Sequence, residues 1–204
     1  MSKIKVIGLT GQTGAGKSTV SEVFQRHGFA VINADLVARE VVAPGTPCLA
    51  EIFAVYGDAV KAPDGSLDRS ATARIVFADK EELSRYNAII FPYINKAVGE
   101  RIARIEKDGA EDVLLDAPTL FESKADQLCD AVVSVTAPEE MRLTRIMERD
   151  HLNEEDARRR MNAQLSEEFF LSHSTYAICN DQGLDALDAA AEDVVYQILA
   201  KFEK

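Results

Sequence analysis

The sequence predicts an α/β protein in three layers, with a five-stranded parallel sheet between two layers of helices. Short runs rich in Val, Ile and Leu alternate with stretches of helical periodicity; they lie at residues 3–9, 30–33, 112–116, 131–136 and 176–179. Continuous apolar runs of this length are typical of parallel strands that are covered on both faces. A glycine-rich segment directly after the first run places an anion-binding turn at the carboxyl edge of this sheet.

That segment, residues 11–18, reads GQTGAGKS and matches the phosphate-binding loop, in which four residues separate a glycine from Gly-Lys-Ser/Thr. A strand before it and a helix expected over residues 18–27 supply the context that the motif requires, and they indicate a P-loop NTPase-type fold. Lys17 is expected on the β- and γ-phosphates and the Ser18 hydroxyl on Mg²⁺. The predicted ATP contacts of this segment are Gly11, Thr13, Gly14, Ala15, Gly16, Lys17, Ser18 and Thr19.

Composition narrows the choice of partners. The formal net charge of −11 argues against a nucleic-acid partner, so an anionic substrate must be held by local arginines and backbone amides. The three cysteines form no C-x-x-C pair and indicate reduced thiols, mostly buried in or near strands. Because no apolar run is long enough to span a membrane, we expect a cytoplasmic protein without membrane association.

A long helical region separates the second and third predicted strands. Residues 36–107 suggest an inserted helical subdomain that binds the second substrate, and a simple long crossover packed on the sheet is the alternative. Asp68 and Asp79 are predicted to cap helices within it, and Pro92 is expected to break or kink the second of them.

The chain lacks the signals of a GTPase. The third strand ends in Asp116-Ala117-Pro118 with no glycine at the expected place, and Asn95-Lys96 is not followed by the acidic residue that reads guanine. A small-molecule kinase needs instead a carboxylate near the acceptor hydroxyl and cations around the transferring phosphoryl group.

Candidates for these roles are present. Asp35 follows the second strand at the cleft end of the sheet, where it could orient the acceptor hydroxyl or, alternatively, cap the following helix. Arg142, Arg145 and Arg149 share one helical stripe; we expect Arg142 on a solvated face and the other two in a mobile lid over ATP. Of the run at residues 158–160, at most one arginine is expected to face the site.

The order and spacing of these motifs resemble the dephospho-CoA kinase family almost from end to end. The matching segments are residues 8–19, 33–35, 39–42, 67–69, 75–77 and 118–122, followed by Arg145, Arg149-Asp150, Ala163-Gln164, and Asn180 with Gly183. The resemblance implies phosphorylation of the ribose 3′-hydroxyl of dephospho-CoA by ATP with Mg²⁺. It implies a core (residues 1–35, 108–140 and 174–204), a CoA-binding insertion at about 36–107 and a lid at about 141–173.

The resemblance also assigns roles. Catalytic positions fall on Asp35, Lys17, Arg145 and Arg149, and substrate-binding positions on Asp35, Arg39 and Arg69. Asn180 lies where the family's loop passes the adenine, with a turn residue as the alternative. Asp116 could bind Mg²⁺ through water or be structural.

The chain departs from the family's pattern at Asn33, Phe91, Thr119 and Phe169. Two other functions stay open: a kinase for a nucleoside or nucleotide, and a non-catalytic ATP sensor, which only the departure at Asn33 favours. Nothing in the sequence argues for an oligomer, and we expect a monomer.

Overall fold

The structure, a computed structural model, describes residues 4–110 and 112–202. The chain forms two compact units, one over Asn33–Arg104 and the other from the residues on either side of it. The unit formed by the residues on either side contains the sheet. Its strands and their flanking helices are β1 (Lys5–Gly11), α1 (Lys17–Arg26), β2 (Ala30–Asn33), β3 (Asp112–Asp116), β4 (Ala131–Thr136), α6 (Glu139–Asp150), α7 (Glu154–Asn162), α8 (Glu167–His173), β5 (Tyr176–Cys179) and α9 (Leu184–Phe202).

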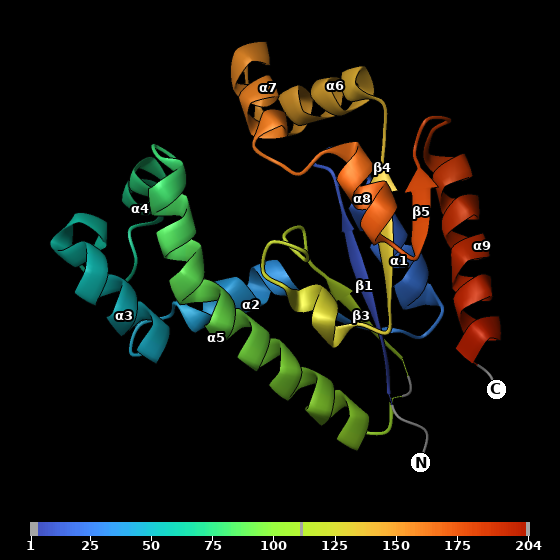
Figure 1. The fold of residues 1–204 in the computed structure, drawn as a ribbon, viewed down its shortest axis with the longest axis horizontal. Helices are drawn as coiled ribbons and strands as arrows, with labels where there is room; N and C mark the ends of the chain where they lie inside the picture. The colour runs from blue at the N-terminus through green and yellow to red at the C-terminus, as the bar shows by residue number, and fades with distance from the viewer. Residues whose placement is uncertain (1–3, 111, 203–204) are drawn as a thin grey trace. The chain divides into compact units, whose positions relative to one another are not determined.

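The predicted five-stranded parallel sheet is confirmed across the described residues. Its order is β2-β3-β1-β4-β5, with β1 parallel to β3 and β4, and β4 parallel to β5 (Figure 1). Since β1 is central, the turn that follows it is flanked by the carboxyl ends of β3 and β4. The first strand extends two residues further than expected, to Gly11, so that the glycine-rich turn begins at the last strand residue.

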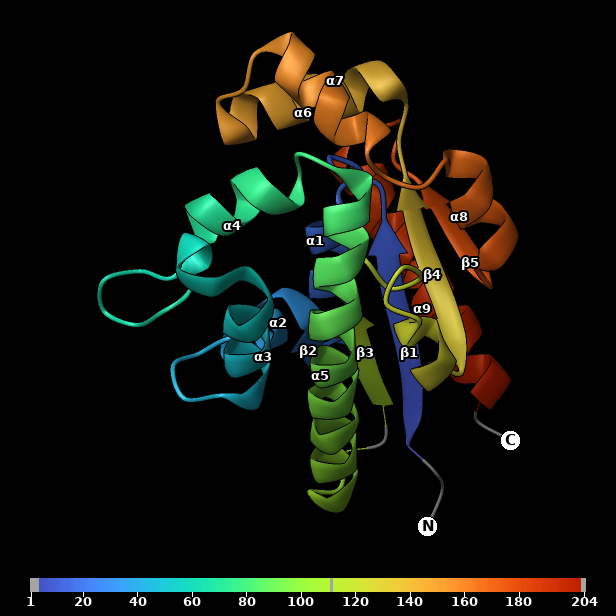
Figure 2. The ribbon, with the colours of Figure 1, turned by 60° about the vertical axis from the view of Figure 1, so that its left-hand side comes forward.

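The two faces of the sheet are covered by different segments. Ile7 and Leu9 on β1 belong to the main apolar core, which α1 and α9 close. The intervening Gly8 faces the other way, toward Leu120 and Cys129, at the position where a Cβ atom would lie 2.8 Å from Leu120 Cδ2. On this second face α8 packs against β4 and β5 (Figures 1 and 2). Within the expected lid of residues 141–173, α8 is therefore part of the sheet's cover.

The unit over residues 33–104 is helical. It contains α2 (Ala34–Val41), α3 (Pro47–Tyr56), α4 (Arg69–Val76) and most of α5 (Lys80–Lys107). The predicted caps are confirmed, because Asp68 Oδ1 accepts from the Ala71 N–H at 2.9 Å and Asp79 Oδ1 from the Glu81 N–H at 2.9 Å. Of the break or kink predicted at Pro92, the break is wrong, because α5 runs through this residue, and the kink stays a prediction. Pro92 is exposed, whereas Ile89, Ile90 and Ile94 of the same helix are buried.

Two further expectations concern membrane-spanning helices and the cysteines. In the described part of the chain no helix has both the length and the apolarity needed to cross a membrane. The cysteines are free thiols, but the expectation that they are mostly buried in or near strands is only partly right, since Cys48 lies on a helix and Cys179 is exposed. Burial raises the pKa of the Cys48 thiol to about 11 and that of Cys129 to about 12.

Candidate phosphate-binding site

The phosphate loop has the geometry of an anion site. It leaves β1 at Gly11 and enters α1 through Gly16, whose φ of 101° is in the left-handed region. Among the described residues no side chain caps the N-terminus of α1, and its first turn carries no acidic residue. The first N–H groups of a helix have no partner within it, and the helix dipole favours negative charge there. The Thr19 N–H donates to Gly16 O at 3.1 Å, which leaves those of Lys17 and Ser18 for an anion such as a nucleotide phosphate.

Lys17 lies against the end of the neighbouring strand. Its Nζ atom forms an ion pair with the Asp116 carboxylate at the carboxyl end of β3, and both side chains are largely buried. The contact follows from the sheet register, which pairs Leu9 of β1 with Asp116. The phosphate loop and the Asp116 carboxylate therefore meet at one end of the sheet.

Asn180 supports the loop. This residue follows β5 and is 1% exposed, and its Nδ2 atom donates to the Ala15 carbonyl oxygen at 2.8 Å. A Cβ atom on Gly16 would lie only 2.6 Å from the same Nδ2 atom, so the close fit needs glycine there. The backbone N–H of Asn180 donates to Thr136 O at 2.8 Å, which ties the loop to β4. The structure gives Asn180 a positioning contact with the loop, and its contact with adenine stays a prediction.

The stripe of arginines on α6 divides into three environments. Arg142 was expected on a solvated face, but this prediction is wrong: it is 7% exposed and its Nε donates to Ala137 O at 3.0 Å. Arg142 is buried because the first turn of α6 packs against the phosphate loop. The packing is close, since a Cβ atom on Gly14 would lie 2.9 Å from Arg142 O. Desolvation correspondingly lowers the pKa of Arg142.

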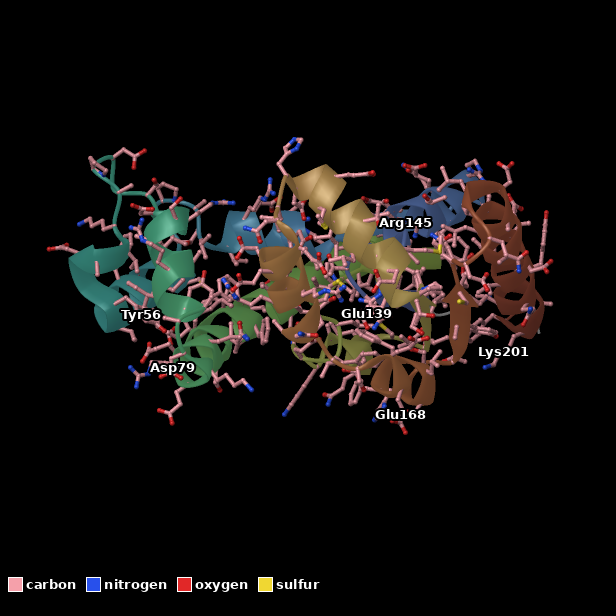
Figure 3. The ribbon with its side chains drawn as sticks, turned by 90° about the horizontal axis from the view of Figure 1, so that it is seen from above. Tyr56, Asp79, Glu139, Arg145, Glu168 and Lys201 are labelled. Atoms are coloured by element: carbon pink, nitrogen blue, oxygen red, sulfur yellow. The ribbon has the colours of Figure 1, made fainter. Side chains whose placement is uncertain are left out.

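Arg145 reaches the loop from the same helix. Its Nη1 atom donates to the Gly14 carbonyl oxygen at 3.2 Å. Figure 3 labels Arg145 together with Glu139, which is the first residue of α6. Arg149 is further along and exposed, and it forms two hydrogen bonds of 2.8 Å with the Asp150 carboxylate. The hydrogen bond to Asp150 raises the pKa of Arg149. Arg145 thus lies at the phosphate loop, whereas Arg149 is held by its sequence neighbour.

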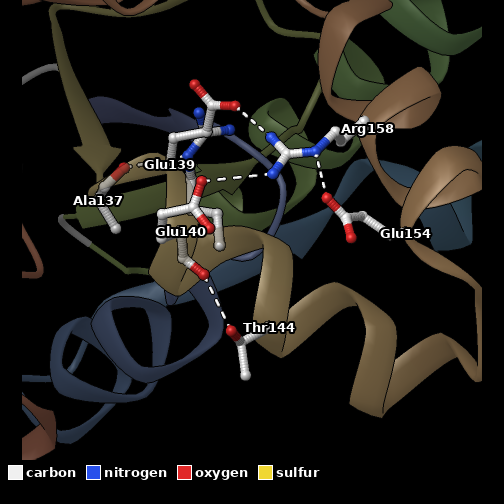
Figure 4. Close-up of polar contacts among 7 residues, drawn as sticks. Ala137, Glu139, Glu140, Thr144, Glu154 and Arg158 are labelled. Atoms are coloured by element: carbon white, nitrogen blue, oxygen red, sulfur yellow. Dashed lines mark hydrogen bonds and ion pairs between the residues drawn. The ribbon is translucent and has the colours of Figure 1, made fainter.

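The three arginines at residues 158–160 form ion pairs with carboxylates. Arg158 binds Glu139 at 2.8 Å, Glu140 at 3.4 Å and Glu154 at 2.9 Å, and so joins α6 to α7 (Figure 4). Arg159 pairs with Glu155 and Asp156, and Arg160 with Asp150. These ion pairs, together with a small apolar cluster of Leu143, Ile146, Ala157 and Met161, form the α6–α7 hairpin.

Sequence reasoning missed one contact of the loop. Gln164, two residues after α7, accepts a hydrogen bond from the Thr13 N–H at 2.7 Å through its Oε1 atom. Ala163-Gln164 is one of the segments that match the family's pattern, but the match assigns Gln164 no role, and 151 positions separate it from Thr13.

Asp35, Arg39 and Arg69 lie in the helical unit. The alternative interpretation of Asp35 as an N-cap is wrong, because α2 begins at Ala34 and its cap is Asn33, whose Oδ1 accepts from the Leu36 N–H at 3.0 Å. Asp35 is in the first turn with an exposed side chain. Arg39 is in the last turn of α2, and Arg69 is the first residue of α4; both are exposed. Their roles in substrate binding stay predictions.

The donor atoms near the loop fit Mg²⁺. The described residues contain no cluster of three His, Cys, Asp or Glu side chains that could hold a metal by itself. Mg²⁺ at kinase sites commonly takes one or two protein oxygen ligands and completes its shell with substrate phosphates and water. The Ser18 hydroxyl in the first turn of α1 and the Asp116 carboxylate are oxygen donors of that kind.

Comparisons with known proteins agree on one family. The dephospho-CoA kinase family model matches residues 5–186. A dephospho-CoA kinase from Streptomyces avermitilis is 44% identical over 190 residues, covering 92% of this chain and 91% of that protein. Among solved structures, one from Thermus thermophilus has a TM-score of 0.79 at 32% identity, covering 97% of this chain and 99% of its own. A dephospho-CoA kinase from Campylobacter jejuni has a TM-score of 0.69 at 27% identity, covering 95% and 96%.

Proposed function

This chain belongs to the dephospho-CoA kinase family, and we propose that it transfers the γ-phosphoryl group of ATP to the ribose 3′-hydroxyl of dephospho-CoA. The products are CoA and ADP, and the step completes coenzyme A synthesis. The observation that carries the proposal is the complete phosphate loop, with uncapped N–H groups at the start of α1 and Lys17 beside Asp116. We further propose a cytoplasmic monomer that uses ATP together with Mg²⁺.

The proposed chemistry needs positioning and charge more than covalent help. The 3′-oxygen forms a bond to the γ-phosphorus while the bond from that phosphorus to the β–γ bridging oxygen breaks. Asp35 accepts the hydrogen bond of the 3′-hydroxyl and takes its proton. Lys17 and the loop N–H groups hold the phosphates, and Arg145 and Arg149 offset the charge on the transferring group. Ser18 and Asp116 would hold Mg²⁺, which when bound neutralises phosphate charge.

The departure at Asn33 has a structural explanation within this proposal. Asn and Asp serve about equally well as N-caps, and Asn33 caps α2. An amide at this position therefore preserves the start of the helix that carries Asp35. The one feature that favoured a non-catalytic sensor is accounted for, and we propose no second function.

The test is an ADP-release assay with Mg²⁺ and ATP, run with and without dephospho-CoA, with the product identified by mass spectrometry. ADP release that requires dephospho-CoA and yields CoA would support the proposal. Equal phosphorylation of a simple nucleoside would indicate a different acceptor, and ATP binding without transfer would indicate a sensor.

Asp35 is tested in the same assay. Replacing Asp35 by Asn is expected to lower kcat by roughly 10²–10⁴ with little change in ATP affinity, because the general base is lost. Asp58→Asn, at another exposed aspartate of the same unit, is the matched control. A kcat close to that of the control would remove Asp35 from this role.

A further inference from the structure

We propose that Gln164 is a positioning residue that couples the α6–α7 hairpin to the phosphate loop, so that phosphoryl binding and hairpin placement depend on each other. The inference rests on the proposed function only in taking the loop as the ATP phosphate site. Its starting observation is the 2.7 Å hydrogen bond from the Thr13 N–H to Gln164 Oε1.

The direction of this hydrogen bond is determined by chemistry. The backbone N–H of Thr13 can only donate, so the side-chain atom facing it must be the oxygen and not the amide nitrogen of Gln164. Within the described chain the structure gives Gln164 Nε2 no protein partner. Its two N–H donors are therefore left for solvent or for a ligand beside the loop.

Gln164 is itself anchored to the hairpin. Its backbone N–H donates to Met161 O at 3.2 Å, and Met161 is buried in the apolar cluster that joins α6 to α7. A displacement of the end of α7 would therefore move the side chain that holds the Thr13 peptide.

The other end of the hairpin touches the next loop residue. Arg145 Nη1 donates to Gly14 O, and the Arg142 carbonyl is so close to Gly14 that a Cβ atom there would lie 2.9 Å from it. Adjacent peptides of the loop are thus held from both ends of one hairpin. A phosphate loop works by aiming backbone N–H groups at the ligand, and small misplacements of such groups are costly for rate.

The first test does not depend on the acceptor. Hydrogen exchange of the Thr13 amide is measured by NMR in the nucleotide-free protein, together with the dissociation constant of ATP. Gln164→Leu is expected to speed exchange and to weaken ATP binding by about fivefold to tenfold, the range of one net hydrogen bond. Gln197→Leu, at an exposed glutamine of α9, is the matched control. Unchanged Thr13 exchange in Gln164→Leu would overturn the proposal.

A second variant keeps the test decisive if the leucine variant does not fold. Gln164→Glu retains an acceptor oxygen, so Thr13 stays protected, but its charge repels phosphates and should weaken ATP more than ADP. ATP and ADP affinities equal to those of the unmodified protein would also overturn the proposal.

The kinetic arm separates positioning from simple stability. With dephospho-CoA as acceptor, Gln164→Leu should lower kcat by about fivefold to tenfold while the KM for dephospho-CoA changes less. A lower melting temperature with normal kcat and ATP affinity would show a merely structural role and contradict the proposal. If the unmodified protein forms no CoA, the proposed function fails, while the exchange and ATP-binding results still decide the role of Gln164.

Discussion

The phosphate loop and the α6–α7 hairpin touch each other but are stabilised in different ways. The loop is held by buried contacts: Asn180 donates to Ala15 O, and the Gln12 N–H donates to Val135 O at 3.1 Å. The hairpin has a small apolar cluster, and most of its polar contacts are exposed ion pairs.

Buried hydrogen bonds hold a single geometry and are costly to lose, whereas exposed ion pairs contribute little and weaken with salt. The difference indicates that the loop is the more firmly held of the two regions, and that the ion pairs of the hairpin weaken as salt concentration rises. Such a division suits the expected lid, because the hairpin is the region held by the weaker contacts.

The largest expected effect comes from filling the space between the two regions. Gly14→Ala places a Cβ atom 2.9 Å from Arg142 O at a φ of +79°. Backbone strain and overpacking together should lower the free energy of unfolding by about 2–4 kcal/mol. In Gly28→Ala, at a φ of +88° with nothing described within 4 Å, strain acts alone. Urea denaturation measures both, and equal losses would show that the contact with Arg142 is loose.

The next effect concerns the buried support of the loop. Asn180→Ala leaves the Ala15 carbonyl without its donor, so the free energy of unfolding should fall by about 1–3 kcal/mol. Asn162→Ala, at an exposed residue that ends α7, serves as the control in the same urea titration. A loss no greater than that of the control would mean that the loop is not held from β5.

The ion pairs of the hairpin should contribute less. Arg158→Gln removes three contacts, yet its exposure limits the expected loss to about 1 kcal/mol or less. Hydrogen exchange of α7 amides should increase in this variant at low salt and differ little from the unmodified protein at high salt. Arg85→Gln removes one exposed ion pair of α5 and should leave α7 exchange unchanged. A salt-independent effect of Arg158→Gln would contradict the contrast between the loop and the hairpin.

The smallest effect is a pH dependence. The hydrogen bond from Arg149, helped by nearby Arg160 and His151, holds the pKa of Asp150 below its ordinary value. Because the folded-state pKa is lowered, the contribution to stability is present above the unfolded-state pKa and is lost as pH falls through the folded one. An NMR titration of the Asp150 carboxyl should give a midpoint below that of an unperturbed aspartate, and this midpoint should rise in Arg149→Gln. A midpoint unchanged by that substitution would rule out the pairing in solution.

Local patterns predicted much of this structure. The apolar runs located the strands to within a few residues, and Asp68 and Asp79 were predicted as caps because capping depends on near neighbours alone. Where two nearby residues could serve the same role, the pattern was not sufficient: Asn33, not Asp35, caps α2.

The sequence by itself determined the parallel α/β sheet, the phosphate loop at the end of its first strand and the family, since these depend on short periodicities and on contiguous motifs. Only the tertiary structure decided which distant side chains hold the loop. Arg142 is buried although its helical stripe looks solvated, and Gln164 and Asn180 reach loop peptides more than 100 positions away. The physical reason is that these contacts depend on how separate elements pack, and no local spacing encodes that packing.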